Sequence, residues 1–151
     1  MYCKDVMRVT TTSLYADSPI SEAIEFMVEK HMGLVPVVDR NGAFVGELSG
    51  DRLMHAMLPH SLMMMRGMKR ASYLNESCEE LKERLDELSS KPISTIMNTH
   101  EKVVYPDTPL SDAMFILSEN QNVVPVVEKE TGKMLGAISF FSVLRAVEGG
   151  E

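Results

Sequence analysis

The stretch "YADSPISEAIEFMVEK" (15–30) decides the fold, because the chain repeats it 90 residues later as "YPDTPLSDAMFILSEN" (105–120). A second stretch, "LVPVVDRNGAFVGELS" (34–49), recurs as "VVPVVEKETGKMLGAIS" (123–139), with one additional residue in the turn. The matching positions are Tyr15/Tyr105, Asp17/Asp107, Pro19/Pro109, Ser21/Ser111, Ala23/Ala113, Pro36/Pro125, Gly42/Gly132, Gly46/Gly136 and Ser49/Ser139. A match of this length at a nearly constant offset indicates two copies of one unit, each of about 55 residues.

The first half of each copy predicts a short strand followed by a helix. The extended piece ends at Leu14, or at Val104 in the second copy. We expect Asp17 or Ser18 to cap the helix and Pro19 to lie early in it. Apolar residues then recur at helical spacing. They are Ile20, Ala23, Ile24, Met27 and Val28 in the first copy, and Leu110, Ala113, Met114 and Leu117 in the second.

The second half of each copy predicts a hairpin and another helix. "LVPVVD" (34–39) is a short apolar strand, Asn41-Gly42 is a strong turn signal, and "FVGELS" (44–49) is the returning strand. The apolar residues of the next helix are Leu53, Met54, Ala56, Met57 and Leu58, matched by Val143, Leu144, Ala146 and Val147. One β-α-β-β-α unit of this size buries a marginal core. We therefore expect the two sheets to pack against each other about a pseudo-two-fold axis.

The connector between the copies predicts a helix of its own. In "NESCEELKERLDELSS" (75–90), Ser77 lies three residues before Glu80, as in a capping box. Leu81, Leu85 and Leu88 form a narrow apolar stripe, so we expect an exposed helix that docks by one edge. The predicted boundaries are 1–58 for the first repeat, 59–91 for the connector and 92–151 for the second repeat.

The composition excludes several classes of protein. The net charge of −7 argues against a nucleic-acid surface, which needs a basic face. No stretch has the length of a signal-peptide core or of a membrane span. Two cysteines, Cys3 and Cys78, favour a reducing compartment, so we expect a cytoplasmic protein. The four histidines are dispersed, which predicts no metal site.

Thirteen methionines are an unusual number for 151 residues. Several of them gather at the end of the first repeat and in the connector: Met54, Met57, Met63, Met64, Met65 and Met68. Methionine fills irregular apolar gaps, and it also suits adaptable contact surfaces. The cluster therefore predicts either ordinary packing or a surface that binds a partner.

The repeated motifs resemble a tandem pair of CBS domains, also called a Bateman module. Each copy has an Asp-x-Pro helix start, an "h-P-V-V-[DE]" strand, a glycine hairpin and a "G-h-h-S" strand end. The resemblance extends over residues 4–148, apart from the connector. It implies an α/β (α+β) fold of two β-α-β-β-α CBS repeats. It also implies a regulatory sensor, not an enzyme, that binds AMP, ADP, ATP or S-adenosylmethionine between its repeats. Such a protein is expected to form a homodimer and to signal in trans to an effector protein, with no required cofactor.

The family's ligand signature resembles G-h-h-[ST]-x-x-[DN], in which the hydroxyl faces a phosphate and the carboxylate binds the ribose. In the first copy Ser49 fits, but Arg52 occupies the carboxylate position and Asp51 lies one residue early. In the second copy Ser139 fits, and Ser142 occupies that position. One step along a helix rotates a side chain by about 100°, so Asp51 is expected to point away from a ribose.

The residues of this signature have two interpretations each. Ser49 is either a ligand contact or a helix N-cap, and Asp51 is then a favourable charge in the first turn. Arg52 either binds a phosphate through its guanidinium or is a solvated surface residue.

The resemblance places further contacts at the start of the first strand and beside the strand prolines. Thr10, Thr11 and Thr12 can supply hydrogen bonds, although threonine is also ordinary in strands. The pairs Val35-Pro36 and Val124-Pro125 either sandwich a base or form sheet core. With their counterparts, the predicted nucleotide-binding residues are Thr11, Thr12, Val35, Pro36, Ser49, Asp51, Arg52, Glu101, Lys102, Val124, Pro125, Ser139 and Ser142, with His100 beside them.

Two functions from different classes follow. One is a ligand-sensing regulatory module with an adenine nucleotide as its ligand. The other is a ligand-free scaffold for dimerisation or partner docking, which the missing carboxylates and the methionine-rich connector favour. The sequence shows no nucleophile–base pair, paired carboxylates or metal set, so we predict no catalytic residues.

Overall fold

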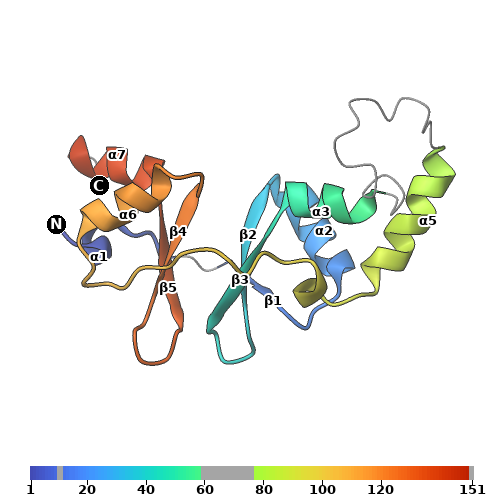
Figure 1. The fold of residues 1–151 in the computed structure, drawn as a ribbon, viewed down its shortest axis with the longest axis horizontal. Helices are drawn as coiled ribbons and strands as arrows, with labels where there is room; N and C mark the ends of the chain where they lie inside the picture. The colour runs from blue at the N-terminus through green and yellow to red at the C-terminus, as the bar shows by residue number, and fades with distance from the viewer. Residues whose placement is uncertain (10–11, 59–76, 150–151) are drawn as a thin grey trace.

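The computed structural model of the protein describes residues 1–9, 12–58 and 77–149. Two similar α/β units lie side by side, each with a small sheet and helices beside it (Figure 1). The elements in chain order are α1 (Cys3–Val6), β1 (Leu14–Tyr15), α2 (Ile20–Lys30), β2 (Leu34–Val38), β3 (Phe44–Ser49), α3 (Gly50–Met57), α5 (Cys78–Ser89), the 3-10 helix η1 (Ile93–Thr95), α6 (Leu110–Leu117), β4 (Val123–Val127), β5 (Met134–Ser139) and α7 (Phe140–Val147).

Repeat one shows the predicted β-α-β-β-α order, and repeat two shows it with a single bridge in place of the first strand. In repeat one, β1 pairs in parallel with β2, and β2 pairs antiparallel with β3. In repeat two, β4 and β5 form the equivalent hairpin, and Val104 makes a single parallel bridge to Val126 in place of a first strand. Both hairpin turns require glycine, because Gly42 and Gly132 have φ values of 86° and 74°. These observations confirm the predicted fold class.

Each repeat has its own core of buried aliphatic side chains. The first core contains Leu14, Ile20, Ala23, Met27, Val35, Val37, Leu48, Leu53, Leu88 and Ile93. The second contains Cys3, Val6, Val104, Leu110, Ala113, Val124, Val126, Ile138 and Val143. The members alternate along the strands, so the opposite face of each sheet is left to meet the other repeat.

The leading segments of the two repeats are exchanged. Helix α1 precedes repeat one in the chain but packs into the core of repeat two, where the Cys3 amide donates to the Thr108 carbonyl at 2.9 Å. The segment with η1 leads into repeat two but packs into the core of repeat one, where the Ile93 amide donates to the Ser18 carbonyl at 2.9 Å. The core of each repeat is therefore completed by the chain segment that precedes the other repeat in the sequence.

The contacts between the repeats come in matched pairs. At the hairpin tips, the Phe44 amide donates to the Gly132 carbonyl at 3.0 Å, and the Met134 amide donates to the Gly42 carbonyl at 3.1 Å. Further along, Arg8 bridges to Ala137 in repeat two, and Asn98 bridges to Glu47 in repeat one. These reciprocal contacts confirm that the repeats pack about a pseudo-two-fold axis.

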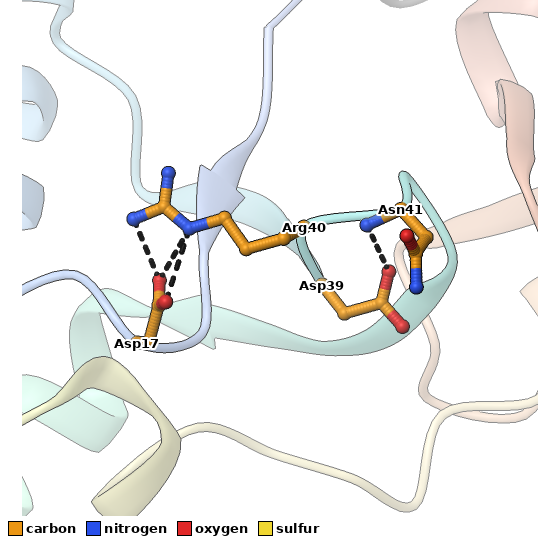
Figure 2. Close-up of polar contacts among 4 residues, drawn as sticks. All are labelled: Asp17, Asp39, Arg40 and Asn41. Atoms are coloured by element: carbon orange, nitrogen blue, oxygen red, sulfur yellow. Dashed lines mark hydrogen bonds and ion pairs between the residues drawn. The ribbon is translucent and has the colours of Figure 1, made fainter.

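The predicted cap of α2 is wrong. Pro19 is the N-cap residue and supplies no side-chain hydrogen bond, while Ser18 is buried. Asp17 instead pairs with Arg40 of the β2–β3 turn, with an Arg40 Nη2 to Asp17 Oδ1 distance of 2.8 Å (Figure 2). The carboxylate is thus engaged by a long-range partner and does not reach the helix amides.

Helix α5 confirms two predictions about the connector. Ser77 Oγ accepts a hydrogen bond from the Glu80 amide at 3.2 Å, which is the serine half of the predicted capping box. The helix docks against α2 and α3 by one edge, with Leu88 buried, Leu85 half-buried and Leu81 40% exposed. The methionines at 63–68 lie outside the described residues.

The outer helices bury only one side of their apolar sequence. Leu53 and Val143 are buried at equivalent positions, whereas Met54 is 58% and Val147 is 73% exposed. The outer helices of repeat two, α6 and α7, expose a larger apolar set than α2 and α3, which consists of Met114, Phe115, Phe140, Phe141, Leu144 and Val147. Within the described ranges, no helix is both long and apolar enough to cross a bilayer.

Candidate functional site

A cleft of about 330 Å³ lies between the sheets of the two repeats. Its walls are largely built from equivalent positions of the two copies, namely Leu34/Val123, Pro36/Pro125, Phe44/Met134 and Glu47/Ala137. Arg8, Val9, Thr12 and Met32 complete the lining without an equivalent residue from the other copy. An apolar cleft with a few polar groups is typical of a site for a small organic ligand.

Strand alternation explains which residues face this cleft. Val35 and Leu48 are fully buried in the core of repeat one, so their neighbours on the strands point the other way. Pro36 and Glu47 are paired across β2 and β3, and both line the cleft. Glu47 is therefore a carboxyl group placed on an otherwise apolar wall.

A second cavity, of about 440 Å³, lies between α1 and α7. Ser142 and Arg145 line it from one face of α7, and Asp5 and Arg8 line it from the N-terminal segment. Arg8 lines both the central cleft and this second cavity, so the two spaces are adjacent at this residue. Two arginines and one aspartate give this region a local excess of positive charge, which favours an anionic group.

Repeat one has an arginine at the position that Ser142 occupies in repeat two. Arg52 donates from Nε to the Ile96 carbonyl at 3.0 Å and from Nη2 to the Met97 carbonyl at 3.2 Å. It therefore ties α3 to the segment that follows η1. Arg52 is exposed, as its interpretation as a surface residue expects, but its guanidinium also has two carbonyl partners.

At the start of α3, the Asp51 carboxylate interacts with Ser49 and with the first helix amides. Ser49 is at the N-cap position, but its hydroxyl makes no capping hydrogen bond to the helix. A hydrogen bond from Ser49 is the main cause that lowers the pKa of Asp51, with smaller contributions from the helix amides and Arg52. The interpretation of Ser49 as a helix cap is therefore wrong, while the favourable placement of Asp51 in the first turn is present.

The model of the CBS domain family matches the chain twice, at residues 3–59 and 93–149. The chain belongs to the CBS-domain family. The crystal structure of the CBS-pair protein CBSX2 from Arabidopsis thaliana is similar, with a TM-score of 0.73 and 24% sequence identity over 98% of this chain and 94% of that one. A crystal structure of CBSX2 in complex with AMP has a TM-score of 0.71 and 24% identity over 98% of this chain and 96% of that one.

A CBS domain-containing protein of unknown function from Kribbella flavida DSM 17836 matches over the full length of both chains, with a TM-score of 0.73 and 19% identity. At these identities the likeness shows the shared fold of a CBS pair. No curated protein matches this sequence.

In this CBS pair, the predicted contact residues separate into distinct places. Thr12, Pro36 and Pro125 line the central cleft, and Ser142 lines the cavity between α1 and α7. Val35 and Val124 are fully buried in the two cores, which agrees with their interpretation as sheet core. Thr10 and Thr11 lie outside the described residues.

Ser139 and Ser142 form a reciprocal capping box at the start of α7. Ser139 Oγ accepts from the Ser142 amide at 3.4 Å, and Ser142 Oγ accepts from the Ser139 amide at 3.2 Å. The two serines thus cap the N-terminus of α7, and Ser142 also lines the cavity between α1 and α7.

Glu101 and Lys102 lie at a third cavity, of about 200 Å³, beside α6. Gln121 orders this segment, because its side chain accepts from the Lys102 amide at 3.0 Å and donates to the Lys102 carbonyl at 2.7 Å. Lys102 Nζ is 3.8 Å from a carboxylate oxygen of Glu119. Neither of these two predicted residues is itself part of the lining of the central cleft.

Sequence reasoning missed Arg8 and Glu47. Strand alternation could have found Glu47, because it lies between Gly46 and Leu48, which are both buried. Arg8 has no such signal, since it reaches the cleft only through the exchange of the leading segments. Among the residues that the structure describes, no group of three or more histidine, cysteine, aspartate or glutamate side chains is arranged to hold a metal ion.

Proposed function

We propose that this CBS pair is a regulatory module that binds an adenine nucleotide between its repeats and signals to a partner protein in trans. The observation that carries the proposal is the apolar cleft, with Arg8 lining both it and the cavity of Arg145 and Ser142 between α1 and α7. A base fits between Pro36 and Pro125, and a phosphate fits beside the two guanidinium groups. The CBSX2 crystal structure with AMP supports this choice of ligand.

Because the protein is acidic, binding of an anionic ligand depends on local positive charge, which Arg8 and Arg145 supply. The chain has a net charge of −7, which opposes the approach of an anion. Arg8 and Arg145 are exposed, and neither makes a side-chain hydrogen bond or ion pair among the described residues. They are therefore available to bind phosphate oxygens.

The cysteines, buried Cys3 and exposed Cys78, are both free thiols, so we place this function in the cytoplasm.

The proposal is tested by thermal shift and calorimetry with adenosine, AMP, ADP, ATP and S-adenosylmethionine. A ligand that binds only the folded state raises the melting temperature by mass action. We expect Arg8→Ala and Arg145→Ala to weaken AMP binding by on the order of tenfold, because each removes a charged hydrogen bond. The same variants should leave adenosine binding almost unchanged, and Lys82→Ala on α5 should leave both unchanged.

A ligand-free scaffold is the second candidate function. Its support is that neither repeat has a carboxylate in the ribose position and that Arg52 is held by the Ile96 and Met97 carbonyls. The exposed aromatic side chains of α6 and α7, among them Phe115 and Phe140, offer a surface for a second copy or for a partner. Absence of a thermal shift with every ligand at millimolar concentration would reject nucleotide sensing and leave this function. Sedimentation of Phe140→Glu against the parent protein then tests the surface.

A further inference from the structure

The segment after η1 is fastened along β3 by backbone and side-chain hydrogen bonds. The Glu47 amide donates to the Asn98 carbonyl at 2.9 Å, and the Asn98 amide donates to the Glu47 carbonyl at 2.7 Å. Asn98 Nδ2 then donates to Glu101 Oε1 at 2.8 Å. This last bond turns the Glu101 side chain back toward β3, so residues 98–101 carry a carboxyl group against the strand that walls the cleft.

The two carboxyl groups of Glu47 and Glu101 meet at this point. Glu101 Oε2 is buried, and no hydrogen-bond donor of the described residues reaches it in the ionised form of the pair. The Glu101 side chain is in contact with the Glu47 carboxyl, and this contact raises the pKa of Glu47. Two ionised carboxylates in contact repel each other, so a single proton held between them is the favoured state.

The groups around the pair do not supply a positive charge to replace that proton. From α3, Asp51 adds a negative charge, and Arg52 is directed to backbone carbonyls. Arg8 lines the cleft with Glu47, and exposed His100 lies next to Glu101 in the chain. The facing parts of β2 and β5 are uncharged. Among the described residues, neither glutamate forms an ion pair.

Burial is the largest cause of a raised pKa at Glu47, followed by the contact with Glu101 and the charge of Asp51. Together they raise the pKa of Glu47 from 4.5 to about 8. The pair is also built on one side of the pseudo-two-fold axis only, because Ala137 stands in repeat two where Glu47 stands in repeat one.

We propose that Glu47 and Glu101 share one proton and that this shared proton links the two repeats. We further propose that this proton-held link makes binding of an anionic ligand in the cleft dependent on pH. With the proton in place, Glu47 donates to Glu101 and holds residues 98–101 against β3. Loss of the proton weakens the link and places a further negative charge on the cleft wall. The dependence of ligand binding rests on the proposed function, whereas the link itself does not.

The link is tested first without any ligand, by melting temperature between pH 5 and pH 9. Because the pKa of Glu47 is higher in the folded than in the unfolded protein, the folded state binds more protons between about 4.5 and about 8. Stability contributed by this group therefore falls as the pH rises through that window. In Glu47→Gln the amide donates to Glu101 at every pH, so we expect a flatter profile and a higher melting temperature than the parent protein at pH 8.5.

Matched variants distinguish the effect of the Glu47–Glu101 pair on the pH dependence of the melting temperature from the effects of other titrating groups. Glu101→Gln should flatten the profile only in part, since its amide nitrogen donates to ionised Glu47 while burial still raises the pKa of Glu47. Glu29→Gln, an exposed change on α2, and His100→Gln should keep the parent profile. A Glu47→Gln profile that parallels the parent protein would overturn the link.

Ligand regulation is tested with AMP by calorimetry at pH 7.2 and pH 9, where its phosphate keeps the same charge because its second pKa is about 6. One linked proton changes affinity by at most about tenfold per pH unit, so we expect a several-fold loss toward pH 9 in the parent protein and none in Glu47→Gln. Equal affinity of the parent protein at both pH values would overturn the regulation. If AMP binds at neither pH, the proposed function fails, while the ligand-free profile still decides the link.

Discussion

Gly136 lies against the backbone carbonyl oxygen of Arg8, where a β-carbon would be only 2.5 Å from that oxygen. The equivalent glycine of repeat one, Gly46, has the same relationship to the carbonyl oxygen of Asn98, at 2.6 Å. In both cases the obstacle is backbone that also hydrogen-bonds to the strand, so it cannot move aside. The glycines allow each leading segment to lie directly on the strand of the other repeat.

We therefore expect Gly136→Ala and Gly46→Ala each to lower the free energy of unfolding by about 1–3 kcal/mol, the usual cost of overpacking. Urea unfolding followed by circular dichroism measures this change. Gly33→Ala is the matched control, because a β-carbon there meets nothing within 4 Å and φ is not positive. Equal stability of the Gly136→Ala and Gly33→Ala proteins would contradict the close approach.

The ion pair between Arg40 and Asp17 (Figure 2) should be visible in the titration of Asp17. The hydrogen bond from Arg40 is the main cause that lowers the pKa of Asp17, and the charge of Arg40 adds to it. We expect Arg40→Gln to raise the pKa of Asp17 toward its ordinary value, as measured by carbon NMR of the carboxyl group.

The sign of the stability effect follows from the lowered pKa. The pair stabilises the fold above the unfolded-state pKa of Asp17, and this contribution is lost as the pH falls through the lower folded-state value. The effect should be small, because both side chains are 62% exposed. Lys129→Gln, at the equivalent turn of repeat two, is the control and should leave the Asp17 titration unchanged.

Cys3 and Cys78 should differ strongly in their reaction with iodoacetamide. Cys3 is fully buried against repeat two, and burial first, then the charge of Asp112, raises the pKa of its thiol. Cys78 is exposed at the start of α5. Since the thiolate is the reactive form, mass spectrometry should find Cys78 modified well before Cys3 in the native protein.

Denaturant provides the control for this experiment, because unfolding should bring the two thiol reactivities together. Rapid modification of Cys3 in the native protein would show that α1 does not remain docked on repeat two.

Arg52 should contribute to stability through its two bonds to the Ile96 and Met97 carbonyls. We expect Arg52→Ala to lower the free energy of unfolding by about 1 kcal/mol or somewhat more, since a charged donor is lost from both carbonyls. Arg52→Lys should lie between the two proteins, because an ammonium lacks the fork that spans two acceptors. Lys82→Ala, an exposed change on α5, should alter stability by less than about 0.5 kcal/mol. A similar result for Arg52→Ala and Lys82→Ala would place Arg52 in solvent.

The repeated parts of the fold could be predicted from sequence because their signals are local. The Asn41-Gly42 turn, the apolar strand before it and the Ser77 cap each depend on residues within a few positions. The cap of α2 could not be predicted, because Asp17 is taken by Arg40, 23 residues away.

The candidate site was predictable only in part, for the same physical reason. Pro36 and Pro125 could be assigned to the cleft because the resemblance to CBS pairs implies ligand contacts beside the strand prolines, and both line it. The meeting of Glu47 and Glu101 depends on residues 98–101 lying along β3, which no local pattern encodes. Arg8 reaches the cleft for a similar reason, through a leading segment that docks on the distant repeat.

The exchange of the leading segments makes the folding of each repeat depend on the other repeat. A fragment cut between the repeats would carry one leading segment that has nothing to pack on and would lack the one that completes its core. Two identical fragments could each donate that segment to the other and restore both cores. A single repeat of this design thus needs a second copy to complete its core, and the connector makes that mutual dependence intramolecular.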